Sequence, residues 1–200
     1  ARRLATSGYL VILPNLFYRV GKEGSYPFTF SKIREDKEHF QEMVKTMDDT
    51  TNNLVNDDSK YILEYLDNNK KVKNKKYGII GYCMSGQYIV TIAANYPEKI
   101  CAAASFYAVK IITEEKDSPH LLANQIKANL YLGFAEHDTW VDEEKLKHIS
   151  EHFNLNTKNF RMEVYKNTEH GFAFPDRHTY DKNSAEKHWT RVNSLLKDSF

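Results

Sequence analysis

The chain has 200 residues, which suits one domain with a sizeable core, and we expect a single domain over residues 1–200. Lys and Arg number 28 while Asp and Glu number 27, so the chain lacks the basic excess typical of nucleic-acid-binding proteins. Its longest apolar runs have the length of a strand and fall short of the roughly 20 residues that span a bilayer. The opening residues, ARRLATSGYL, lack the apolar core and cleavage pattern of a signal peptide.

The cysteine content also limits the class of protein. Cys83 and Cys101 do not form a disulfide framework, and no CxxC pair indicates a zinc site. We therefore expect a protein of the reducing cytoplasm, with no metal or organic cofactor and no nucleic-acid or membrane partner. The sequence leaves the oligomeric state open.

Apolar runs and helical periodicity alternate along the chain. The runs predict strands over residues 9–13, 77–82, 101–107, 129–134 and 160–165. Periodicity predicts two helices within 35–68, separated near Asp48 to Thr50, and further helices over 84–95, 142–153 and 181–196. Short apolar strands separated by helices predict an α/β fold, a mostly parallel sheet with helices on both faces.

Residues that can carry chemistry follow three of the predicted strands. In a parallel sheet of this kind, ligands bind outside the carboxyl ends of the strands. Cys83 follows the strand over 77–82, Asp138 comes shortly after 129–134, and His170 comes shortly after 160–165. We therefore expect these three side chains to meet at one edge of the sheet.

The stretch Gly81-Tyr82-Cys83-Met84-Ser85 matches a nucleophile elbow in which cysteine replaces the usual serine. Such an elbow is a sharp strand-to-helix turn, so the residues two before and two after the nucleophile must be small. Gly81 and Ser85 meet this need. The helix that begins near Met84 points its amino end at the sulfur and favours the reactive thiolate. The Met84 amide is placed to donate to an oxyanion. The alternative is a buried structural cysteine in a glycine-containing turn.

The order nucleophile, acid, histidine is that of the α/β-hydrolases. In this reading His170 takes the proton of Cys83, and Asp138 fixes the imidazole tautomer and stabilises its charged form. Glu169 and Asp142 are rival acids, but Glu169 is adjacent to His170 in sequence, and Asp142 is placed to be a helix N-cap.

Over nearly its whole length the chain resembles the dienelactone hydrolase (carboxymethylenebutenolidase) family. The resemblance is carried by GYCMSG around Cys83, GFAEHDTWV around Asp138 and EHGFAFPDRHTYDKNSAEKHW after His170. SFYAVK and DSPHLL resemble one branch of the family. The resemblance implies an α/β-hydrolase fold and hydrolysis of a small-molecule lactone or ester through a thioester acyl-enzyme.

Two features depart from the family. Well-known members have a substrate-binding arginine four residues after the histidine, where this chain has Phe174, and Arg34 is a candidate for a second substrate arginine. In addition, ARRLATSGY resembles the end of the family's first helix. The resemblance therefore implies a chain that is truncated at its N-terminus and lacks the family's second oxyanion donor, and we expect such a chain to be unstable or poorly active.

Other candidates stand near strand ends. Tyr107, Phe172 and His120 are candidate substrate-binding residues, although the two aromatic rings also suit ordinary packing and His120 also suits the cap of a short helix. We expect the remaining histidines to be solvated, and Cys101 to belong to the core.

Three other functions remain open from the sequence. The same triad could act as a general esterase or thioesterase, and a catalytically silent hydrolase fold could serve as a binding module. Cys83 could also be a redox-sensing thiol, although no resolving cysteine lies near it in the sequence.

Overall fold

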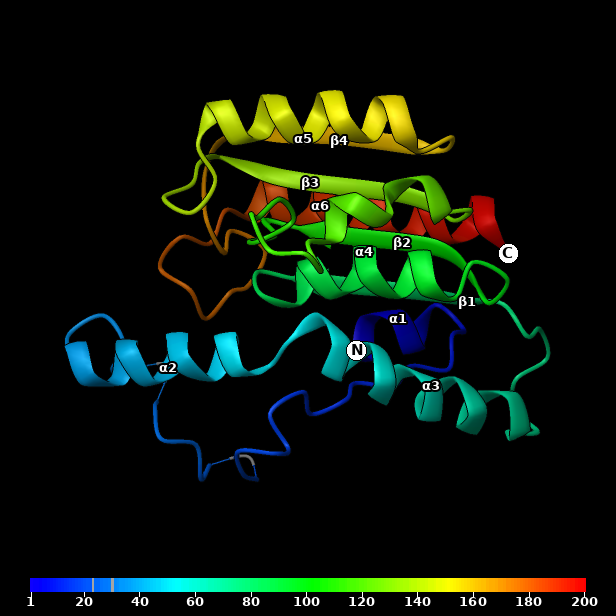
Figure 1. Cartoon of the computed structure of the whole chain (residues 1–200), viewed down its shortest axis with the longest axis horizontal. Coiled ribbons are helices and arrows are strands. Elements are labelled where there is room, and N and C mark those ends of the chain that lie inside the picture. The colour runs from blue at the N-terminus through cyan, green and yellow to red at the C-terminus, as the bar shows by residue number, and fades with distance from the viewer. Residues whose placement is uncertain (23, 30) are drawn as a thin grey trace. The chain divides into compact units, whose positions relative to one another are not determined.

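The computed structural model describes residues 1–22, 24–29 and 31–200, and the chain divides into two compact units, Ala1–Lys73 and Asn74–Phe200. The division falls in a mostly exposed segment rich in lysine and asparagine, residues 68–76. All the strands among the described residues lie in the second unit (Figure 1).

The first unit contains the helices α1 (Arg2–Thr6), α2 (Lys37–Asp49) and α3 (Asn52–Asn68). The Asp36 carboxylate accepts hydrogen bonds from the first amides of α2, and the Thr51 hydroxyl accepts one from the Leu54 amide in α3. These caps explain why the helical stretch is interrupted, and the predicted break near Asp48 to Thr50 is confirmed.

The predicted strand over residues 9–13 is wrong. The segment is irregular, and Leu10 and Leu13 are 50% and 82% exposed. An extended segment becomes a strand only when a neighbouring strand accepts and donates its backbone hydrogen bonds. The described part of the first unit contains no other strand, so the apolar run has no partner within its own unit.

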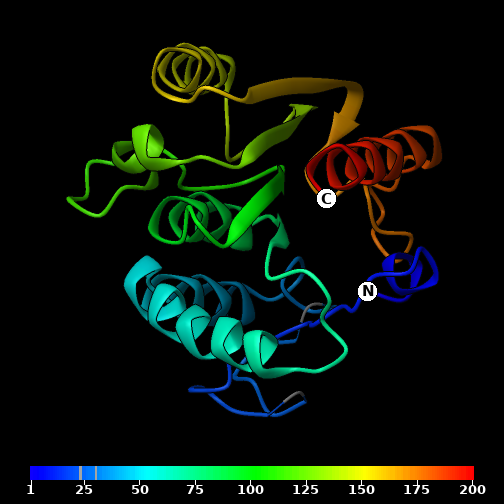
Figure 2. The ribbon, with the colours of Figure 1, turned by 90° about the vertical axis from the view of Figure 1, so that its right-hand side faces the viewer.

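The second unit contains a parallel sheet in the order β1 (Tyr77–Tyr82), β2 (Ile100–Phe106), β3 (Asn129–His137) and β4 (Phe160–Glu169). The connections run through α4 (Ser85–Asn95), the short 3₁₀ helix η1 (Pro119–Gln125) and α5 (Glu143–Asn156). These three lie on one face of the sheet, and α6 (Lys182–Ser199) covers the other (Figure 2). The predicted α/β class, with helices on both faces, is confirmed.

Burial on both faces explains the composition of the central strands. Ala102, Ala103 and Ala104 in β2 have no exposed surface, and neither do Leu132 and Phe134 in β3. Strands covered on both faces read as continuous apolar runs without alternation, which is why the sequence reveals them so clearly.

Candidate active site

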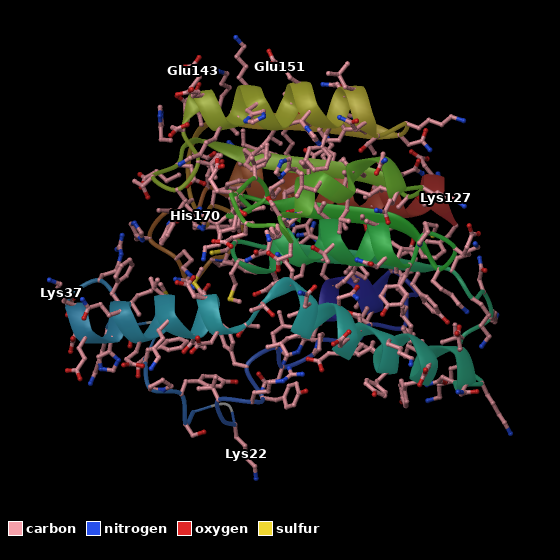
Figure 3. All side chains as sticks on the ribbon, viewed as in Figure 1. Lys22, Lys37, Lys127, Glu143, Glu151 and His170 are labelled. Carbon is pink, nitrogen blue, oxygen red and sulfur yellow. The ribbon has the colours of Figure 1, made fainter. Side chains whose placement is uncertain are left out.

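Four side chains of interest are each the first residue after a strand. Cys83 follows β1, Tyr107 follows β2, Asp138 follows β3 and His170 follows β4. Figure 3 labels His170 at one end of the sheet and Lys127, which precedes β3, at the other. The sheet therefore gathers a thiol, a phenol, a carboxylate and an imidazole at its carboxyl edge, within the second unit.

The turn that carries Cys83 has the geometry of a nucleophile elbow. Cys83 has a φ of 53°, in the left-handed region that non-glycine residues rarely adopt. A Cβ atom at Gly81 would lie 2.5 Å from the Ser85 carbonyl oxygen, and one at Gly86 would lie 2.3 Å from the Ala108 Cβ. Both positions therefore require glycine.

Ser85 locks the elbow as well as fitting it. Its Oγ accepts a hydrogen bond from the Tyr82 amide at 2.8 Å and donates one to the Tyr82 carbonyl at 2.8 Å. The sequence indicated only that serine is small enough for this position. The hydroxyl's bridging role depends on the turn geometry, which the sequence alone does not specify.

The backbone of Cys83 is held from both sides. Its amide donates to the Phe106 carbonyl at 3.0 Å, and its carbonyl accepts from the Gly86 and Val109 amides at 3.1 and 3.2 Å. Met84 occupies the N-cap position of α4, where the first amides of a helix have no acceptor within the helix. The position of Cys83 is thus fixed by β2, by the loop after β2 and by the start of α4.

Asp138 and His170 form a buried pair. The His170 Nδ1 donates to the Asp138 Oδ2 at 2.8 Å, and the Trp140 amide donates to Oδ1 at 2.9 Å. The Asp138 side chain has no exposed surface, so both of its oxygens are held by the protein. This arrangement leaves the opposite nitrogen, His170 Nε2, buried and without a hydrogen-bond partner among the described residues.

The charge of His170 follows from its neighbours. Burial opposes the imidazolium form, but the hydrogen bond to Asp138 and the nearby Cys83 sulfur outweigh it and raise the pKa of His170 to about 9. His170 is therefore protonated at neutral pH, and the only thiol that contributes to this shift is that of Cys83.

A bulge brings His170 level with Asp138. Ala135 pairs with Tyr165, but His137 pairs with Glu169, so β4 contains two more residues than β3 over this interval. Without the bulge, Thr168 would stand opposite Asp138. The carboxylate of Glu136 braces the bulge by accepting from the Asn167 amide at 2.7 Å, where Asn167 has a φ of 56°.

Aromatic rings pack beside the imidazole. The ring of Tyr107 lies 5.0 Å from that of His170 and 5.3 Å from that of Phe172, measured between centroids. The Trp140 ring lies 6.5 Å from that of His170. Tyr107 is thus in contact with the pair, whereas Phe172, with no exposed surface, lies behind it in the core.

The other two substrate-binding candidates belong to other parts of the chain. His120 lies in η1, where its Nδ1 is 2.7 Å from the Ser118 hydroxyl and its ring is 5.0 Å from that of His152. The N-cap residue of η1 is Ser118, so His120 lies within the short helix and does not cap it. Arg34 belongs to the first unit, whereas Cys83, Asp138 and His170 all belong to the second.

The expectation that His188 is solvated is wrong. His188 is 1% exposed, and its Nε2 lies 2.7 Å from the Tyr82 hydroxyl. Its Nδ1 lies 3.0 Å from the Ala185 carbonyl, which can only accept, so Nδ1 carries the proton and Tyr82 donates to Nε2. The partner stands 106 positions earlier in the chain, beyond the reach of a local pattern.

The described residues contain neither a metal-binding cluster nor a helix that could span a membrane. Over residues 1–22, 24–29 and 31–200, no group of three or more His, Cys, Asp or Glu side chains is arranged to hold a metal ion. In the same residues, no helix combines the length and apolar character needed to cross a membrane.

The sequence profile of the dienelactone hydrolase family matches residues 1–200. The chain belongs to this family. A putative carboxymethylenebutenolidase from Synechocystis sp. is 27% identical over 200 residues, which cover 97% of this chain and 76% of that protein. A carboxymethylenebutenolidase homolog from Xenopus tropicalis is 30% identical over 171 residues, covering 85% of this chain and 61% of that protein.

A solved structure shares the fold. The crystal structure of a putative dienelactone hydrolase from Klebsiella pneumoniae superposes with a TM-score of 0.82 at 22% identity, over 98% of this chain and 78% of that one. The chain is thus an α/β hydrolase of the dienelactone hydrolase family, and an ester or lactone hydrolase by membership of it.

Proposed function

We propose that this chain hydrolyses a small-molecule lactone or carboxylic ester through a Cys83–His170–Asp138 triad and a thioester acyl-enzyme. One observation carries the proposal: Cys83 stands on a strained elbow while His170 Nδ1 donates to a fully buried Asp138 at 2.8 Å. The names of the relatives, carboxymethylenebutenolidases, support a lactone as the substrate class.

In the first half-reaction the Cys83 sulfur attacks the carbonyl carbon of the ester. A carbon–sulfur bond forms, and the carbonyl π electrons move onto oxygen, where the Met84 amide donates a hydrogen bond to the developing charge. The tetrahedral intermediate then breaks its bond to the leaving alcohol oxygen, which takes a proton from His170 Nε2. For a lactone, the alcohol stays tethered to the acyl group.

In the second half-reaction water hydrolyses the thioester. His170, now neutral, accepts a proton from the water as its oxygen attacks the acyl carbon, and collapse of the intermediate breaks the carbon–sulfur bond. The products are the carboxylic acid and the Cys83 thiolate beside a protonated His170. Asp138 accepts from His170 Nδ1 and so holds the tautomer that leaves Nε2 facing the reaction.

The charge of His170 suits this cycle. Its raised pKa of about 9 keeps a proton available for the leaving alcohol at neutral pH. An imidazolium beside the sulfur stabilises the thiolate, which is the nucleophilic form of cysteine. Both cysteines are free thiols, which supports a reducing compartment such as the cytoplasm.

Trapping the acyl-enzyme tests the proposal. A panel of aryl esters, lactones and thioesters is offered to the native chain, and intact mass is recorded after rapid acid quenching. We expect an acyl adduct on Cys83, and we expect Cys83→Ala to lose both the adduct and turnover. The matched control is Cys101→Ala, because Cys101 is the second residue of β2 and Cys83 lies at the opposite, carboxyl edge of the sheet. Turnover that survives Cys83→Ala would overturn the proposal, and the preferred member of the panel identifies the substrate class.

A further inference from the structure

The hydroxyl of Tyr107 lacks a hydrogen-bond partner at a position where the fold excludes water. Tyr107 is 1% exposed, and its Oη has no partner among the described residues. A buried hydroxyl without a partner destabilises the folded protein, so such groups are rare unless a ligand or an ordered water completes them. Phenylalanine would fill the same space without that cost.

The backbone fixes this hydroxyl in place. Tyr107 has a φ of 38°, which is strained for a residue with a large side chain. Its amide donates to the Gly133 carbonyl at 2.6 Å, and its ring packs against His170 and Phe172. The strain and the packing together hold the phenol in one orientation beside the imidazole.

The surroundings of the hydroxyl point to a ligand that accepts a hydrogen bond. Burial raises the pKa of Tyr107, and the nearby charge of Cys83 raises it further, so the phenol stays protonated over the working pH range. The neighbouring Tyr82 hydroxyl, which donates to His188 at 2.7 Å, makes no hydrogen bond with it. Tyr107 is therefore a neutral donor, within the electrostatic reach of the nucleophile, that has no acceptor in the free protein.

We propose that the Tyr107 hydroxyl donates a hydrogen bond to the substrate's carbonyl oxygen while Cys83 attacks, as an oxyanion donor beside the Met84 amide. The inference rests on the proposed function and names a further catalytic residue for it. Tyr107 keeps its proton throughout. The bond that forms joins sulfur to carbon, the π electrons move to oxygen, and the phenol stabilises that charge in both half-reactions.

Tyr107→Phe tests the inference with two chemistries at the same sulfur. Hydrolysis of 4-nitrophenyl acetate passes through an oxyanion, and we expect kcat and kcat/KM to fall together by about 100-fold, as on loss of one oxyanion donor. Alkylation of Cys83 by iodoacetamide forms no oxyanion, so its rate should stay at the native value. The urea midpoint should equal or exceed that of the native chain, because the variant removes an unpaired buried hydroxyl.

Tyr131→Phe is the matched control for removing a buried phenol. The Tyr131 hydroxyl bonds Glu163 and Tyr165 at 2.9 Å each, so this variant should lose stability and keep its turnover. Native turnover in Tyr107→Phe would overturn the inference, and so would an equal slowing of hydrolysis and alkylation, which would mean that Tyr107 acts through the thiol. Either result leaves the test of Cys83→Ala unaffected, so failure of the inference and failure of the proposed function are distinguishable.

Discussion

At the scale of single residues, the orientation of His170 depends on the hydrogen bonds that the two Asp138 oxygens accept. One oxygen accepts from His170 and the other from the Trp140 amide, at 2.8 and 2.9 Å, with no exposed surface on the side chain. A carboxylate so placed can only accept hydrogen bonds, which forces the His170 proton onto Nδ1 and leaves Nε2 free for the role that we propose for it. The orientation of His170 is therefore set by the acid.

Asp138→Asn should disturb this orientation while keeping the shape of the side chain. An amide has a single carbonyl oxygen, so it cannot accept from both Trp140 and His170, and its NH₂ group disfavours a proton on His170 Nδ1. We expect kcat for 4-nitrophenyl acetate to fall by roughly 10²- to 10⁴-fold. The pKa of His170, followed by the pH dependence of kcat/KM, should move down from about 9. An unchanged rate and pH profile would exclude Asp138 as the orienting acid.

At the scale of the elements, the bulge in β4 decides which residue faces Asp138. The bulge holds Asn167 in a left-handed conformation, and the Glu136 carboxylate accepts from its amide while also pairing with Lys166 at 2.6 Å. Glu136 touches neither the thiol nor the imidazole in any contact described above. It is a positioning residue, acting through the register of β3 and β4.

Removing this brace should lower turnover. We expect Glu136→Ala to reduce kcat by roughly 10-fold or more, since small misplacements of a catalytic group have large effects. Glu136→Gln, which keeps an oxygen for the Asn167 amide, should retain more activity than the alanine variant. Glu151→Ala is the control, because Glu151 is an exposed residue of α5. Native kcat in Glu136→Ala would show that the bulge holds without the carboxylate.

The elements that local patterns define could be predicted from the sequence. The buried strands are apolar runs, and Asp142 caps α5 by accepting from the Lys145 amide, as its position after Val141 indicated. The ends of the strands were harder to predict. The strands β3 and β4 extend beyond the predicted residues 134 and 165 to His137 and Glu169. These extensions are polar and depend on pairing between the strands, which no local pattern reports.

The candidate site likewise has some features that the sequence predicts and others that it does not. Cys83, Asp138 and His170 could be placed at strand ends because each follows an apolar run. The bulge, the bridge made by Ser85 and the orphan hydroxyl of Tyr107 depend on contacts between segments distant in the sequence. The strand predicted over residues 9–13 failed for the reverse reason, because an apolar run makes a strand only where a partner strand is available.

At the scale of the whole molecule, the second unit contains the sheet, the proposed triad and both tryptophans, Trp140 and Trp189. Tryptophan fluorescence therefore reports the unfolding of this unit alone. The groups of this unit with strongly shifted pKa values include Glu163 and His170. Hydrogen bonds from Arg191, Lys187 and Tyr131 outweigh burial and lower the pKa of Glu163 to about 2, while that of His170 is raised to about 9.

These two shifts predict the pH dependence of stability. The folded state binds the His170 proton more tightly than the unfolded chain, so this contribution is complete below pH 6.5 and is lost as the pH rises through 9. The contribution of Glu163 is complete above pH 4.5 and is lost as the pH falls towards 2. The combined contribution of these two groups to the free energy of unfolding should therefore be greatest between about pH 4.5 and 6.5.

Urea titrations followed by tryptophan fluorescence at pH 3, 5.5 and 9.5 check this profile. We expect His170→Gln to remove the alkaline loss, on the order of 2 kcal/mol, and Glu163→Gln to remove the acid loss. His170→Gln should leave the acid loss of stability unchanged, and Glu163→Gln should leave the alkaline loss unchanged. Each variant therefore serves as the control for the other. If stability is still lost at alkaline pH in His170→Gln, another titrating group is the main cause of that loss.

Activation of the Cys83 thiol by His170 is tested most directly by chemical labelling of that thiol. Intact-mass labelling with iodoacetamide is followed from pH 4 to 9 on the native chain and on His170→Ala. If His170 activates the thiol, we expect fast labelling of Cys83 below pH 7 that slows in the variant. Labelling that rises only near the ordinary cysteine pKa of about 8.5, and that is the same in both proteins, would contradict it.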